Sequence, residues 1–212
     1  EKWSEVARDI DPPIRLGVFG DPVAHSRSPE MQNAALRACE LEAQYARFHI
    51  RPHELRSALR FLRNLDFVGV NLTVPHKTAG LGQIDEADES ASRVGAVNTI
   101  RLRDKRLIGA NTDGEGFLHA IRSEFSVDLR DLRVLVIGAG GGTGRAIAWQ
   151  CALENCERLV LVNRTFEKAN ALAERLRSFF MEARVLGPAA RLEPVAWEES
   201  LMRMQLADID LI

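Results

Sequence analysis

The sequence predicts an α/β protein divided into two domains that have mostly parallel sheets. Short apolar runs alternate along the chain with longer segments in which apolar residues recur at helical spacing. A charged connector near residues 128–133 separates two such series. The length of 212 residues is long for one domain and suits two small ones.

The first series has the order strand, helix, strand, helix, strand. Residues 15–20 are an apolar run that ends in glycine, and Ser28-Pro29 then offers an N-cap followed by proline at the first helical position. Residues 45–50 alternate between apolar and polar, which is typical of a strand. A helix is expected to start at Pro52, and residues 67–74 are again strand-like.

The first domain is expected to end with a pair of strands. Residues 85–94 are polar and compatible with a helix. Residues 96–102 and 107–110 then look like two strands joined around Asp104-Lys105, which suggests a hairpin. A helix is expected from Asp113 to about Phe125.

The second series repeats the alternation of strand and helix. We expect strands at residues 132–137, 159–162, 183–186 and 208–212, and helices at residues 145–153 and 166–179. The sequence stops as the last strand begins, so we expect this domain to be incomplete. The predicted division is a first domain at residues 1–112, a linking helix and connector at 113–130, and a second domain at 131–212.

Composition excludes several classes of protein. Hydrophobic residues make up 46% and charged residues 27%, with a net charge of -2 and interleaved signs, so neither nucleic acid nor an anionic membrane is an expected partner. The three cysteines have no disulfide or metal spacing, which favours a reducing compartment and no metal site. Without a long apolar run or signal peptide, we expect a cytoplasmic protein. The sequence does not indicate an oligomeric state.

A glycine-rich loop between a predicted strand and helix indicates dinucleotide binding. It comprises Gly138, Ala139, Gly140, Gly141, Gly142, Thr143 and Gly144. Backbone amides and a helix N-terminus in such a loop can bind a pyrophosphate, and glycines let the backbone approach it. Its spacing is GxGxxxG, because Thr143 stands at the third glycine position of GxGxxG. A flexible turn is the alternative.

The residues that follow the next strand favour NADP over NAD. An acidic residue at this position would bind the ribose 2′-hydroxyl, whereas arginine suits a 2′-phosphate. The sequence has Asn163, Arg164 and Thr165 here, and Lys168 could add positive charge. The alternative is a solvated arginine at the start of a helix.

Three polar clusters in the first domain predict a small-molecule site. They are residues 25–29, 71–77 and 111–114, each at a predicted strand end or loop. Ligands of open α/β sheets bind at the carboxyl ends of strands, where these clusters could converge. Their hydroxyls and amides suit a polyol with one carboxylate, and a lysine paired with an aspartate could relay the proton that accompanies hydride transfer.

These motifs together resemble the shikimate dehydrogenase family. The matching stretches are GVFGDPVAHSRSP from Gly17, GVNLTVPHK from Gly69, GAVNTI from Gly95, GANTDGEGF from Gly109, VIGAGGGTGRA from Val136 and NRT from Asn163. They occur in family order and cover nearly the whole chain. The resemblance implies an N-terminal α/β substrate domain with a mostly parallel sheet and a C-terminal NADP-binding Rossmann domain, and the reversible reduction of 3-dehydroshikimate to shikimate in aromatic amino acid biosynthesis.

The resemblance also implies roles for individual residues. Substrate binding falls to Ser26, Ser28, Asn71, Thr73, Asn98 and Asp113, with the two serines at the carboxylate, and catalysis to Lys77 with Asp113. Each has a structural alternative: Ser28 and Asp113 could cap helices, the amides and Thr73 could satisfy strand ends, and Lys77 could be a solvated surface lysine.

The sequence departs from the family pattern at its end. The loop beside the nicotinamide, and the helices that return to the substrate domain, have no counterpart after residues 208–212. Two other functions remain open. A quinate/shikimate dehydrogenase shares the lysine and aspartate but can use NAD, and a non-catalytic metabolite sensor could use the same scaffold.

Overall fold

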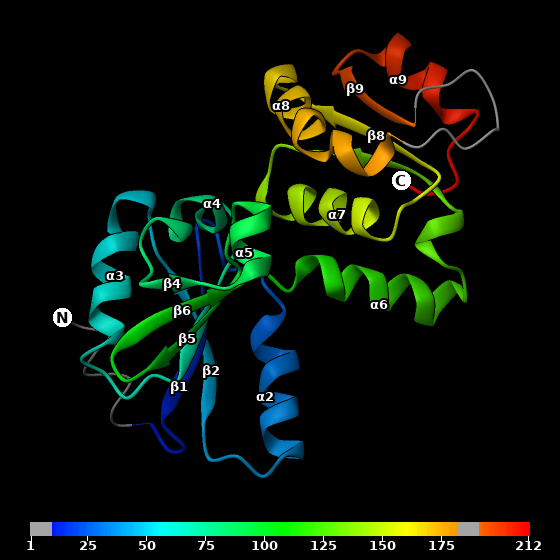
Figure 1. Ribbon diagram of the computed structural model, residues 1–212. Coiled ribbons are helices and arrows are strands. Elements are labelled where there is room, and N and C mark those ends of the chain that lie inside the picture. The colour runs from blue at the N-terminus through cyan, green and yellow to red at the C-terminus, as the bar shows by residue number, and fades with distance from the viewer. Residues whose placement is uncertain (1–9, 182–190) are drawn as a thin grey trace. The chain divides into compact units, whose positions relative to one another are not determined.

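The computed structural model describes residues 10–181 and 191–212, and the chain divides into two compact units, Glu1–Asn111 and Thr112–Ile212 (Figure 1). Within these described residues each unit contains its own β-sheet, 6-stranded in the first and 3-stranded in the second. The strand expected at residues 183–186 lies outside the described residues.

The first unit is built on a mostly parallel sheet with the strand order β2-β1-β3-β5-β6-β4. Its strands are β1 (Ile14–Gly20), β2 (Gln44–His49), β3 (Gly69–Leu72), β4 (Glu86–Ala87), β5 (Thr99–Arg103) and β6 (Arg106–Ala110). β1 pairs in parallel with β2 and β3, and β4 pairs in parallel with β6. β5 is antiparallel to both β3 and β6, so it alone of these strands runs in the opposite direction.

The hairpin expected around Asp104-Lys105 is confirmed. Arg103 pairs with Arg106, so two residues form the turn between β5 and β6. Both have positive φ, 51° at Asp104 and 61° at Lys105. Positive φ at both central residues is the signature of a type I′ turn, whose twist matches that of the flanking strands.

The helices of this unit differ from expectation at several boundaries. They are η1 (Pro52–Glu54), α2 (Ser28–Ala38), α3 (Leu55–Leu62), α4 (His76–Leu81) and α5 (Glu89–Val94). Ser28 is the first residue of α2 and Arg27 is its N-cap, so the N-cap prediction for Ser28 is wrong by one position. Residues 85–94 contain the short strand β4 before α5. The helix begins only at Glu89, because Asp88 caps it by accepting a 2.8 Å hydrogen bond from the Ala91 N–H. α4 was not predicted, since six residues are too few for a clear periodicity.

The apolar face of α3 closes the core over the sheet of the first unit. Leu55, Leu59 and Leu62 are each at most 1% exposed and join a cluster with Phe19 and Ile100. Burying a leucine side chain contributes about 2 kcal/mol, so this face supplies much of the local stability. The core supports β1, β3 and β5, and the predicted binding residues follow or precede these strands.

The second unit has a parallel sheet with the order β7-β8-β9. Its strands are β7 (Arg133–Ile137), β8 (Arg158–Asn163) and β9 (Leu192–Ala196), and its helices are α6 (Asp113–Phe125), η2 (Leu129–Asp131), α7 (Gly142–Leu153), α8 (Phe166–Leu176), η3 (Arg177–Phe180) and α9 (Glu199–Leu206). Leu211 forms a parallel bridge to Val134 of β7, which is what the structure shows of the strand expected at 208–212. β9 and α9 were not predicted.

Helix α6, which we expected to link the domains, packs against α7 within the second unit. Gly114 allows this contact, because a Cβ there would lie 2.9 Å from the carbonyl oxygen of Ala146 in α7. α7 itself starts at Gly142 with Gly141 as N-cap, three residues earlier than expected. The helix N-terminus therefore lies inside the glycine-rich segment.

Candidate functional site

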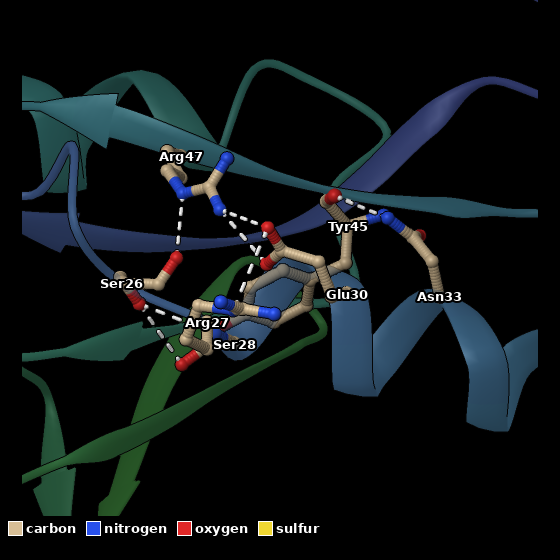
Figure 2. A network of polar contacts seen from close by, with 7 residues as sticks. All are labelled: Ser26, Arg27, Ser28, Glu30, Asn33, Tyr45 and Arg47. Atoms are coloured by element: carbon tan, nitrogen blue, oxygen red, sulfur yellow. Dashed lines mark hydrogen bonds and ion pairs between the residues drawn. The ribbon is translucent and has the colours of Figure 1, made fainter.

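Ser26 lies in the loop between β1 and α2 and Ser28 begins α2, and Arg47 of β2 holds this segment in place (Figure 2). Arg47 Nε donates to the Ser26 carbonyl oxygen at 2.7 Å, and Arg47 Nη2 donates to both Glu30 carboxylate oxygens at 2.6 and 2.8 Å. Hydrogen bonds from its own backbone and from Arg47 lower the pKa of Glu30, which keeps the carboxylate charged. Ser26 Oγ donates to Ser28 Oγ at 3.2 Å, so the two serines lie side by side.

Tyr45 joins the serine loop to the rest of the unit, although sequence reasoning did not select it. The side chain is 5% exposed, and its hydroxyl donates to Asn71 Oδ1 at 2.8 Å. Burial raises the pKa of Tyr45, and a hydrogen bond with Ser28 partly opposes that rise. The phenol therefore stays protonated and able to donate. Asn33 of α2 brackets the Tyr45 backbone with bonds of 2.8 and 2.9 Å.

Asn71 and Asn98 meet at one edge of the sheet. Asn71 Nδ2 donates to the Asn98 carbonyl oxygen at 3.2 Å and to Thr99 Oγ1 at 3.1 Å, and Thr99 Oγ1 donates to Asn98 Oδ1 at 2.9 Å. β5 is antiparallel to β3, and its first residue, Thr99, pairs with Asn71. The start of β5, and with it Asn98, therefore lies beside the carboxyl end of β3. A parallel strand at this position would have its carboxyl end there instead.

These contacts make up the polar network of the first unit, in which hydrogen bonds join Ser26 to Ser28 and link Tyr45 to Asn71, Asn98 and Thr99. It contains the predicted residues Ser26, Ser28, Asn71 and Asn98 and adds Tyr45 and Thr99. No sequence signal distinguished Tyr45 from a core residue, because the alternation in β2 predicts only that its side chain is buried. Thr99 directly follows the predicted Asn98, and its hydroxyl was a signal that could have been used.

The remaining predicted residues lie on other elements of the two units. Thr73 follows β3, and its backbone N–H donates to the Phe19 carbonyl oxygen of β1 at 2.9 Å. Lys77 lies in the first turn of α4, and its carbonyl oxygen accepts the Val97 N–H at 2.8 Å. Asp113 is the first residue of α6 in the second unit. Thr112 is the N-cap residue of that helix, so Asp113 does not occupy the capping position considered from the sequence.

The glycine loop of the second unit contains glycines of two kinds. Gly144 is required by packing, because a Cβ there would lie 2.3 Å from the Gly138 carbonyl oxygen. Gly138 has a φ of +84°, and a Cβ there would meet no atom within 4 Å. At Gly141 the nearest atom would be 3.4 Å away. The backbone at Gly138 and Gly141 thus leaves open space that side chains would fill.

The rest of the loop is anchored to the sheet and to α7. Ala139 is fully buried, and its N–H donates to the Val162 carbonyl oxygen of β8 at 3.1 Å. Gly142, Thr143 and Gly144 form the first turn of α7, whose backbone amides have no acceptors within the helix itself. A helix N-terminus next to an open backbone cradle suits an anionic pyrophosphate.

The segment after β8 contacts the glycine loop directly. Gly140 N–H donates to Asn163 Oδ1 at 3.1 Å, and Asn163 Nδ2 donates to the Thr165 carbonyl oxygen at 2.9 Å. Arg164 is exposed between these two residues. Lys168 lies in the first turn of α8, and a Cβ added to Gly140 would lie 2.8 Å from its Cβ. The structure therefore brings together the predicted cofactor residues Gly140, Asn163 and Lys168.

Residues 10–181 and 191–212 contain no group of three His, Cys, Asp or Glu side chains that could hold a metal ion. In the same part of the chain, no helix is long and apolar enough to cross a membrane.

Comparisons with known proteins match both units. A family profile described as the shikimate dehydrogenase substrate binding domain matches residues 18–100, and one described as shikimate / quinate 5-dehydrogenase matches residues 120–190. The curated shikimate dehydrogenase (NADP(+)) of Methanopyrus kandleri is 42% identical over 173 residues, which are 81% of this chain and 59% of that protein. The chain thus spans about three fifths of the length of that relative.

Two solved structures with the same fold are also shikimate dehydrogenases. The structure of shikimate 5-dehydrogenase from Thermus thermophilus in complex with shikimate is 36% identical, with a TM-score of 0.72, and the match covers 93% of this chain and 84% of that one. A shikimate dehydrogenase in complex with NADP+ is 34% identical, with a TM-score of 0.78 and coverage of 92% and 64%.

Proposed function

Because this chain belongs to the shikimate dehydrogenase family, we propose that the full-length protein reversibly reduces 3-dehydroshikimate to shikimate with NADPH. The observation that carries this proposal is the polar network that pairs Ser26 with Ser28 and links Tyr45 through Asn71 to Asn98. It supplies hydroxyls at one end and amides at the other, which suits a ring that has one carboxylate and several hydroxyls.

The proposed substrate contacts follow from this chemistry. Ser26 and Ser28 donate hydroxyl hydrogen bonds to the carboxylate of the substrate, within a loop that the ion pair of Arg47 and Glu30 holds in place. The amides of Asn71 and Asn98, with Thr73 and Asp113, bind the ring hydroxyls. A hydroxyl of the ring can both donate and accept, and an amide side chain offers both functions.

The residues of the second unit fit NADP. The open backbone at Gly138 and Gly141 and the N-terminus of α7 would receive the pyrophosphate, and Arg164, with Lys168 nearby, would pair with the 2′-phosphate. Bound NADPH supplies the hydride. A carboxylate that would favour the ribose hydroxyl of NAD is absent from Asn163, Arg164 and Thr165.

We assign the proton transfer of this reaction to Lys77. Negative charge develops on the substrate oxygen as the ketone is reduced, and the ammonium of Lys77 stabilises this charge and donates a proton to the oxygen. Once this oxygen carries the proton, Asp113 accepts a hydrogen bond from the resulting hydroxyl, and it also orients the lysine. In the reverse direction Lys77 takes the proton back. A cytoplasmic location completes the proposal, since Cys39, Cys151 and Cys156 are all free thiols.

Steady-state assays of the full-length protein test this function. We expect NADP-dependent oxidation of shikimate, with much lower kcat/KM for quinate and with NAD as cofactor. The description of the second profile also names quinate, which makes quinate the alternative substrate. A higher kcat/KM for quinate than for shikimate would show that quinate is the substrate. Binding of shikimate without turnover of either compound would favour a metabolite sensor.

A serine variant tests the substrate assignment separately. Ser26→Ala should weaken shikimate binding about tenfold, because it removes a hydrogen bond to a charged group, and should leave NADP affinity unchanged. Isothermal titration with each ligand measures both. Unchanged shikimate affinity would leave Ser26 with only its structural bond to Ser28.

A further inference from the structure

We propose that Asn163 is a positioning residue of the cofactor site, which fixes the glycine loop against the turn that carries Arg164 and does not itself bind the 2′-phosphate. This inference rests on the proposed function, because it concerns how NADP is held. It separates two neighbouring residues that the NRT motif groups together.

The amide of Asn163 has a protein partner at each end. Its oxygen accepts the backbone N–H of Gly140 at 3.1 Å, and its nitrogen donates to the Thr165 carbonyl oxygen at 2.9 Å. Only this orientation satisfies both contacts, because an N–H needs an acceptor and a carbonyl needs a donor. One side chain therefore ties two separate backbone segments together.

Packing reinforces the connection. A Cβ added to Gly140 would lie 2.9 Å from Asn163 Oδ1 and 2.8 Å from the Cβ of Lys168. The glycine loop thus sits directly on Asn163 and on the first turn of α8. The position of the loop depends on the Asn163 side chain having this length and this orientation.

The second bond determines the backbone around Arg164. The Asn163 side chain reaches the carbonyl of the residue two positions later, so Arg164 lies inside a closed turn. The same Thr165 carbonyl oxygen also accepts the Lys168 N–H at 3.1 Å, at the start of α8. Asn163 consequently holds both the loop expected to bind the pyrophosphate and the turn that presents the guanidinium.

This arrangement predicts a specific pattern of affinities. Loss of Asn163 should weaken every ligand that contains the pyrophosphate, whether or not it carries a 2′-phosphate. Loss of Arg164 should weaken only ligands that carry the 2′-phosphate. If Asn163 bound the 2′-phosphate itself, its loss would instead show the second pattern.

The experiment measures binding of NADP+, NAD+ and 2′,5′-ADP to the full-length protein by calorimetry, with NMR titration for weak binding. Asn163→Ala should weaken NAD+ about tenfold, since two hydrogen bonds of ordinary strength are lost, and NADP+ by at least that factor, because the turn that carries Arg164 is released as well. Arg164→Ala should weaken NADP+ and 2′,5′-ADP and leave NAD+ within about twofold. Asn170→Ala, at an exposed position of α8, is the matched control and should change none of the three.

Weaker binding of NADP+ and 2′,5′-ADP by Asn163→Ala, with unchanged NAD+ affinity, would overturn the proposal. Thermal unfolding followed by circular dichroism checks the fold, and Asn163→Ser, which also loses both bonds, provides a second variant. Unfolding of both variants would likewise contradict the proposal, because it would assign Asn163 to global stability. Failure of the wild-type protein to bind NADP+ would instead reject the proposed function.

Discussion

The two units offer binding groups of different kinds. In the first unit the groups from Ser26 to Asn98 are mostly side chains, which lie on or beside α2, β2, β3 and β5. In the second unit the glycine loop offers backbone, and the side chain of Asn163 serves to hold it. A site made of side chains fails when an atom is removed, whereas a site made of backbone fails when an atom is added. This difference suggests which substitutions separate the two sites.

The largest effect is expected at Lys77, the side chain that we propose to be catalytic. Lys77→Ala should lower kcat about 100-fold to 10,000-fold, the usual contribution of a general acid or base, while NADP affinity stays unchanged. Stopped-flow or steady-state assays with shikimate, together with calorimetry for NADP, provide the measurement. A folded variant with the parental kcat would show that another group supplies the proton.

Asp113 sharpens the same test. Asp113→Asn should also lower kcat, and the double variant with Lys77→Ala should lose far less than the product of the two single losses, because we propose that both residues act on one oxygen. Multiplicative losses would mean that the residues act independently. Circular dichroism is needed in parallel, since Asp113 begins α6.

An added methyl group tests the backbone site. Gly144→Ala places a Cβ 2.3 Å from the Gly138 carbonyl oxygen, so the loop must shift, and we expect about 1–3 kcal/mol of destabilisation and weaker NADP binding. Gly116→Ala in α6 is the matched control, because a Cβ there meets no atom within 4 Å and alanine favours the helix by up to about 1 kcal/mol. Denaturant unfolding and calorimetry on both variants measure the contrast. Equal stability of the two would show that the loop tolerates side chains.

The smallest effect is expected at Tyr45. Tyr45→Phe keeps the buried ring but leaves Asn71 Oδ1 without its 2.8 Å donor, so the KM for shikimate should rise about fivefold with kcat and NADP affinity unchanged. Steady-state kinetics measure both constants. A change in kcat alone would place the hydroxyl at the chemical step and not in the support of the binding site.

Much of the architecture could be predicted because local patterns specify it. Alternation predicted β2, apolar spacing predicted α3, and the dipeptide at 104–105 predicted the turn between β5 and β6. Short elements such as α4 and β4 escaped prediction, because six and two residues contain too few periods to distinguish helix, strand and loop. The early start of α7 was missed because glycines usually indicate a loop.

The candidate site was predicted less completely, and the reason is physical. Serine, asparagine and lysine at strand ends, and glycines before a helix, are recognisable from sequence, since their chemistry belongs to the residue or its close neighbours. The contacts of Tyr45 with Asn71, of Arg47 with Ser26, and of Asn163 with Gly140 join residues that are 20 or more positions apart. Only the pairing of the strands brings such residues together, because a hydrogen bond depends on distances that the folded sheet sets. The sequence by itself thus determined the residue types of the site and most of its strands and helices, while the tertiary structure decided which side chains hold the binding groups in place.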